Sequence, residues 1–148
     1  MSNSVKDFLS KDAQQRITKA IQIAEKNTTG EIRIRIDAHT KTENILDDAT
    51  RVFYELKMDK TVYNNGVLLY IAVKDKTYYI VGDTAINQIV HQQFWDTIAA
   101  EMNGYFSKQE FEAGIIHVIE KIGQTLHQYF PINELKNDNE LSDDISFG

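Results

Sequence analysis

The stretch NNGVLLYIAVKDKTYYIVGD, residues 64–83, decides the fold of this chain. Residues 66–73 form a nearly unbroken apolar run, which is typical of a strand that is covered on both faces. Residues 74–76 are polar, and residues 77–81 then form a second strand-like segment. Because only a short polar segment separates the two strands, we expect them to pair as an antiparallel hairpin.

Polar side chains stand at both outer ends of this hairpin. Asn64 and Asn65 precede the first strand, and Asp83 follows the second. Antiparallel pairing places these ends side by side, so amide and carboxylate oxygens meet at one edge of the sheet. Asp59 in the preceding loop and Asp96 in the following helix are further candidates, and oxygen ligands of these types bind Ca²⁺ or Mg²⁺. The alternative is that the asparagines only form a turn and the aspartate only caps the next helix.

The composition narrows the class of protein. A chain of 148 residues with 42% hydrophobic residues is long enough for one domain with one core. Its net charge of −6 argues against a nucleic-acid partner, which requires a basic surface. The absence of cysteine excludes disulfides, thiolate metal sites and a cysteine nucleophile. No apolar run has the roughly 18 residues of a membrane span, and the first residues lack the apolar core of a signal peptide. We therefore expect a cytoplasmic protein.

Apolar periodicity predicts the elements that precede the hairpin. Ser10 is a candidate N-cap for a first helix, and Gly30 is suited to a left-handed turn after that helix. Residues 31–37, EIRIRID, alternate strictly and predict a half-covered strand near an edge of the sheet. A second helix, capped by Asn44 or Thr42, leads from this strand to the hairpin. The strand–helix–strand order predicts a parallel crossover.

The last helix has the clearest pattern. Ser107 and Glu110 form a capping box at its start, and Pro131 ends it. Gly114 and Gly123 lie inside this helix, where each costs roughly 1 kcal/mol relative to alanine. We expect that the helix approaches the sheet closely at these two positions.

The order of the elements predicts an α/β domain with a small mixed sheet over residues 1–131. A further helix is expected over residues 92–102, where an Asn–Gly pair stops it. Residues 132–148 are polar and acidic, which predicts a disordered tail.

Several motifs resemble those of the TPM domain, a family shared by bacterial envelope proteins and thylakoid-lumen photosystem-repair proteins. The matching segments are Thr-Gly-Glu-Ile at residues 29–32, Asn-Gly-Val-Leu-Leu at residues 65–69, Tyr-Ile-Val-Gly at residues 79–82, and the region from Phe106 to Ile115. The resemblance implies a three-layer αβα sandwich around a four-stranded sheet, with divalent metal ions held by loops at one edge of the sheet. Some members of the family are described as acid phosphatases.

The chain departs from the family pattern after the second hairpin strand. Where the family often has Gly-Tyr-Gly-Leu-Glu-Gly, residues 82–87 are Gly-Asp-Thr-Ala-Ile-Asn. Asn87 thus replaces a family glutamate, and Asp83 supplies a new carboxylate. Most members also carry an export signal or a membrane anchor, and the sequence shows neither.

These observations predict a stand-alone TPM-like domain that binds Ca²⁺ or Mg²⁺ as a binding or regulatory module. The expected ligands are Asp83, Asn64 and Asn65, with Asp59 and Asp96 as weaker candidates. The alternative is a metal-assisted acid phosphatase, in which the ion polarises a phosphoryl oxygen and activates water. A third possibility is a protein-interaction domain that uses the acidic tail or a surface groove.

Overall fold

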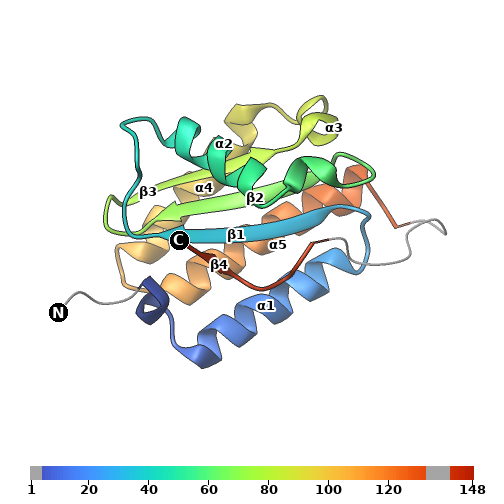
Figure 1. Cartoon of the computed structure of the whole chain (residues 1–148). Coiled ribbons are helices and arrows are strands. Elements are labelled where there is room, and N and C mark those ends of the chain that lie inside the picture. The colour runs from blue at the N-terminus through green and yellow to red at the C-terminus, as the bar shows by residue number, and fades with distance from the viewer. Residues whose placement is uncertain (1–4, 133–140) are drawn as a thin grey trace.

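A four-stranded mixed sheet lies between two layers of helices (Figure 1). The computed structural model describes residues 5–132 and 141–148. The strands are β1 (Glu31–Asp37), β2 (Gly66–Ala72), β3 (Thr77–Gly82) and β4 (Ser146–Phe147), in the spatial order β3-β2-β1-β4. β1 is parallel to β2 and to β4, and β2 is antiparallel to β3. The predicted αβα sandwich, the hairpin and the parallel crossover are confirmed.

The helices divide between the two faces of the sheet (Figure 1). They are η1 (Val5–Phe8), α1 (Lys11–Glu25), α2 (Ile45–Glu55), η2 (Met58–Lys60), α3 (Thr84–Asn87), α4 (Gln92–Phe106) and α5 (Phe111–Tyr129). α1, α4 and α5 cover one face, and α2 covers the other. None of the helices in the described part of the chain combines the length and the apolarity that a membrane crossing requires.

β2 is the central strand, and every one of its residues is buried. Its side chains alternate between two cores, as the pleat of a strand dictates. Val67, Leu69 and Ile71 pack into the core beneath α1, α4 and α5. Leu68 and Tyr70 pack into the smaller core beneath α2. The unbroken apolar run in the sequence therefore reflects two separate cores that share one strand.

The C-terminal residues differ from the expected disordered tail of residues 132–148. Positions 133–140 lie outside the described residues, but Ser146–Phe147 form β4 and pair with Arg35 and Ile36 of β1. The backbone N–H of Leu141 donates a hydrogen bond of 2.6 Å to the Glu31 side chain. The physical reason is that β1 would otherwise present an open row of backbone groups at the sheet edge, which the last residues cover.

Local signals predict some of the turns and caps correctly. The side chains of Ser10 and Asn44 cap α1 and α2, accepting backbone N–H hydrogen bonds of 3.0 and 2.9 Å. The left-handed turn expected at Gly30 is wrong, because none of the described glycines has a positive φ angle. A glycine here leaves room for the Leu126 side chain, because a Cβ atom would lie 2.6 Å from its Cδ2 atom.

The junction between α4 and α5 also differs from the expectation. α4 continues through Gly104 to Phe106, and Ser107 is its C-cap rather than the start of a capping box. α5 begins at Phe111 without a side-chain cap, after Gln109 in a left-handed conformation. The Phe106 ring packs 5.1 Å from the rings of Tyr78 and Phe111, so tertiary packing extends the helix past the local stop signal.

The two glycines of α5 allow close approach of neighbouring helices rather than of the sheet. A Cβ atom at Gly123 would lie 2.8 Å from the Cβ of Ala24 on α1. A Cβ atom at Gly114 would lie 2.9 Å from the Cβ of Tyr105 on α4. The prediction of close approach is therefore correct, but the partner that it named is wrong.

Gly123→Ala is expected to destabilise the protein by about 1–3 kcal/mol, although alanine favours a helix, because α1 and α5 must move apart. Gly104→Ala is the matched control, since no atom lies within 4 Å of a Cβ there. It is expected to stabilise α4 by roughly 0.5 kcal/mol. Urea unfolding of both variants measures the difference, and a Gly123→Ala protein as stable as the wild type would contradict the helix contact.

Candidate metal site at one edge of the sheet

The pairing of β2 with β3 brings the two outer ends of the hairpin together. Val67 lies opposite Gly82, and the backbone N–H of Asp83 donates to the carbonyl of Gly66 at 2.9 Å. One residue further out, the N–H of Ala85 donates to the Asn64 carbonyl at 3.0 Å. The polar segments on either side of the hairpin are therefore held against each other by backbone hydrogen bonds.

The carboxylate of Asp83 is buried and only half satisfied. Its side chain caps α3, because Oδ1 accepts a hydrogen bond of 2.7 Å from the N–H of Thr84. Its other oxygen, Oδ2, is buried and has no hydrogen-bond partner among the described residues. Burial raises the pKa of Asp83, the cap hydrogen bond opposes this, and the nearby charge of Asp59 raises it further. The expected capping role of Asp83 is confirmed for Oδ1, and Oδ2 has no partner in the described part of the chain.

Two neutral oxygens at the same edge share this property. The amide nitrogen of Asn65 donates to the Thr29 hydroxyl at 3.0 Å, whereas its Oδ1 is buried without a partner in the described structure. The hydroxyl of Thr61 is also buried and unpartnered among these residues. A buried acceptor without a partner costs about 1–3 kcal/mol. Within residues 5–132 and 141–148 the unpartnered buried side-chain oxygens are these two and Asp83 Oδ2.

The other three predicted ligands, Asp59, Asn64 and Asp96, lie in different places relative to Asp83. Asp59 lies in η2, close enough for its charge to act on Asp83, and is 3.6 Å from the Lys60 ammonium. Asn64 has an exposed side chain and a left-handed backbone with φ of 52°, which fits the turn alternative. Asp96 is exposed on α4 and accepts from Gln92 at 2.8 Å.

Two further contacts define the surroundings of this edge. The same Gln92 amide nitrogen donates to the carbonyl of Ile80, which places Asp96 beside the middle of β3 rather than beside Asp83. Asn87 accepts a long hydrogen bond of 3.4 Å from the indole of buried Trp95. Its side chain is therefore engaged in the packing of α3 against α4.

The donor set at this edge consists of two carboxylates and several neutral oxygens. Within the described ranges, no three Asp, Glu, His or Cys side chains gather in a group able to hold a metal ion. Asp83 and Asp59 are thus the only acidic residues that the described contacts connect here, and Asn65 and Thr61 supply amide and hydroxyl oxygens. Calcium and magnesium accept mixed sets of this kind. The orphaned oxygens fit a cation better than they fit an anion or an apolar ligand.

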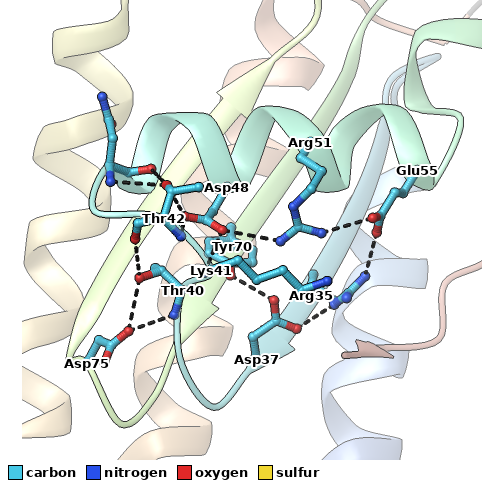
Figure 2. A network of polar contacts seen from close by, with 11 residues as sticks. Arg35, Asp37, Thr40, Lys41, Thr42, Asp48, Arg51, Glu55, Tyr70 and Asp75 are labelled. Carbon is cyan, nitrogen blue, oxygen red and sulfur yellow. Dashed lines mark hydrogen bonds and ion pairs between the residues drawn. The ribbon is translucent and has the colours of Figure 1, made fainter.

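A second polar cluster, which the sequence analysis did not predict, lies between β1, β2 and α2 (Figure 2). Asp37 at the end of β1 accepts hydrogen bonds of 2.7 Å from both the Tyr70 hydroxyl and the Arg35 guanidinium. Glu55 joins Arg35 to Arg51 by ion pairs of 3.6 and 2.9 Å. Two features of the sequence could have indicated this cluster, namely Tyr70 inside an apolar run and Asp37 at the end of a strand.

Asp48 is a fully buried carboxylate of this cluster. It accepts hydrogen bonds from the backbone N–H groups of Lys41 and Thr42 and from the Thr42 hydroxyl, at 2.8, 3.1 and 2.7 Å. Burial alone would raise the pKa of Asp48, but these bonds and the contact with Arg51 outweigh it and hold the pKa below its usual value. Both carboxylate oxygens are satisfied, so the cluster stabilises the fold and leaves no free ligand atom on this residue.

The mixed sheet, the helices on both faces and the polar loops at one edge define an αβα-sandwich domain. The family model of the TPM domain matches residues 3–125, and the chain belongs to this family. A search of curated proteins gave no match.

Solved structures share the fold. The NMR structure of the BA42 protein from the psychrophilic bacterium Bizionia argentinensis is 42% identical, with a TM-score of 0.86 over 100% of both chains. The N-terminal domain of a P. gingivalis protein is 13% identical, with a TM-score of 0.66 over 83% of this chain and 79% of that one. The N-terminal domain of the cg2496 protein from Corynebacterium glutamicum is 13% identical, with a TM-score of 0.64 over 89% and 83%. The last two likenesses concern the fold alone.

Asp48→Asn is expected to lower the free energy of unfolding by about 2–4 kcal/mol, because the amide nitrogen faces donors that the carboxylate satisfied. Asp47→Asn, an exposed neighbour in the same helical turn, is the control and is expected to change stability by less than about 0.5 kcal/mol. Since the pKa of Asp48 is lowered in the folded state, its stabilisation is present above the unfolded value of 3.8 and is lost as the pH falls below it. The difference in the free energy of unfolding between wild type and Asp48→Asn should therefore become smaller as the pH falls. A difference that grows would contradict the stabilising role of the Asp48 carboxylate.

Proposed function

We propose that this protein binds one divalent cation, Ca²⁺ or Mg²⁺, at the edge formed by Asp83, Asn65, Thr61 and Asp59. The observation that best supports the proposal is that the buried Oδ2 atom of Asp83 has no hydrogen-bond partner among residues 5–132 and 141–148. A buried carboxylate oxygen without a partner is unfavourable. A bound cation would give this oxygen a partner and would balance its negative charge.

The ligand roles follow from burial and charge. Asp83 Oδ2 is the anionic ligand, while Asn65 Oδ1 and Thr61 Oγ1 are neutral ligands from the segment that precedes β2. Asp59 adds a second negative charge from η2. The ligands come from η2, from the loop before β2 and from the N-cap of α3, and Ca²⁺ tolerates irregular geometry better than Mg²⁺ does, so we expect calcium to bind more tightly. With only two carboxylates, the expected dissociation constant is on the order of 10⁻⁴–10⁻³ M.

A bound cation would link η2 and the start of β2 to the start of α3, because its ligands come from all three segments. These segments are separated by the whole hairpin in the sequence, and the ion would join them through side chains rather than through backbone alone. Because the unfolded chain does not bring the ligands together, binding raises the stability of the folded state by mass action. The site then acts as a binding or regulatory module. The acid-phosphatase alternative stays a prediction, which no contact of the described residues selects.

The first test is thermal unfolding of wild type in EDTA and in excess CaCl₂ or MgCl₂. At 100 times the dissociation constant a ligand adds about 2.7 kcal/mol, which corresponds to a rise in Tm of several degrees. Asp83→Asn is expected to lose this rise, because it removes the charge but keeps an amide oxygen for the cap of α3. Asp96→Asn removes one acidic charge away from the site and is expected to keep the full rise.

The pH dependence of Asp83→Asn in EDTA gives an independent check. Since the pKa of Asp83 is raised in the folded state, its unfavourable contribution grows as the pH rises through and above the unfolded value of 3.8. The variant should therefore gain stability relative to wild type as the pH rises from 3.8 to the raised pKa of Asp83, and the difference in stability should stay constant above that pKa. For the thermal unfolding test, two results rule the proposal out. One is a wild-type Tm that neither calcium nor magnesium raises, and the other is a rise in Tm that is the same in Asp83→Asn as in wild type.

A further inference from the structure

An apolar cavity of about 650 Å³ lies at the end of the hairpin opposite the candidate metal site. The β2–β3 turn, η1, the end of α4 and the start of α5 enclose it, and these segments meet on one side of the molecule (Figure 1). Its volume falls within the range of roughly 300–1,000 Å³ that is typical of small-molecule sites. None of the residues that line the cavity is a proposed ligand of the cation.

Four aromatic side chains form much of the apolar part of the cavity wall and contact one another, and the polar residues Asn103, Ser107 and Gln109 also line it. The ring centroids of Phe8 and Phe111 are 4.5 Å apart, and Phe106 packs edge-on 5.1 Å from both Phe111 and Tyr78. Val73 at the end of the hairpin adds aliphatic surface. All five side chains are only partly buried, although they pack against the main core. The wall is thus preformed, and its apolar surface is incompletely covered within the described residues.

Two lysines give the mouth of the cavity a positive charge. Lys74 and Lys76 line it from the β2–β3 turn, and both are exposed. Asp75 lies between them in sequence, but its carboxylate is engaged by the His39 ring and the Thr40 backbone N–H, each at 2.7 Å. The acidic charge of the turn is therefore held toward another loop. An aromatic cavity beneath two cationic side chains is complementary to a molecule with an apolar body and one anionic end.

We propose that this cavity binds a single-chain fatty acid. The alkyl chain lies among Phe8, Phe106 and Phe111, and the carboxylate lies between the ammonium groups of Lys74 and Lys76. The apolar wall accounts for affinity, since each buried methylene strengthens binding by about fourfold. The lysines account for the preference for an acid over an alcohol of the same length. The site is independent of the cation, because the two lie at opposite ends of the same hairpin.

The test is calorimetric titration with decanoate below its aggregation concentration, in EDTA so that no calcium soap forms. We expect decanoate to bind several-fold more tightly than decanol and much more tightly than hexanoate. Amide NMR signals of Phe8, Val73 and Phe106 should move on titration, whereas those of Asn65 and Asp83 should not.

The decisive variant is the double substitution Lys74→Glu, Lys76→Glu on the exposed turn. It is expected to weaken decanoate binding by about five- to tenfold and to leave decanol binding unchanged. The double substitution Lys26→Glu, Lys57→Glu is the matched control, because it makes the same change in net charge at two exposed lysines that do not line the cavity. It should bind decanoate as the wild type does, and so should Asp83→Asn.

Three results would overturn the proposal. The first is the absence of decanoate binding to the wild type. The second is binding that moves no signal of the aromatic wall. The third is an equal loss of affinity in the Lys26→Glu, Lys57→Glu control and in the Lys74→Glu, Lys76→Glu variant, which would indicate attraction to the overall charge of the protein.

Discussion

The burial of β2 on both faces is the constraint on which the rest of the structure depends. Its side chains alternate between two separate cores. A shift of one residue in the pairing of β2 would therefore move every side chain of this strand from one core into the other. The register with β3 is therefore fixed, and with it the position of each end of the hairpin. One end places Asp83 beside Gly66, and the other carries the turn with Lys74 and Lys76. Both proposed sites follow from one pairing.

The two polar clusters differ in how completely the protein satisfies them. Around Asp48, backbone donors, a hydroxyl and Arg51 occupy both carboxylate oxygens, and the pKa of this residue is lowered. Around Asp83, one oxygen is satisfied and the other is buried without a partner in the described structure, and the pKa is raised. Opposite pKa shifts in two buried aspartates thus separate a cluster that stabilises the fold from one that is suited to an added cation.

Sequence patterns predict those features that depend on neighbouring residues. The N-cap Asn44 and the hairpin required only local chemistry and periodicity, and both are confirmed. The capping box at Ser107 fails because Phe106 packs on Tyr78 and α4 continues to Phe106, so that Ser107 ends this helix, which no local pattern reveals. β4 has only two residues, too short for any periodicity, and forms because β1 offers an open edge. Thr61 was missed because a loop hydroxyl has no pattern in the sequence, and it becomes significant only when folding buries it without a partner among the described residues.

The most direct measurement is a crystal structure grown in excess calcium and examined by anomalous scattering. The account predicts a peak about 2.3–2.6 Å from Asp83 Oδ2, with Asn65 Oδ1 and Thr61 Oγ1 among its neighbours. A well-ordered edge at saturating calcium without such a peak, or a peak only at exposed carboxylates such as Asp96, would contradict it.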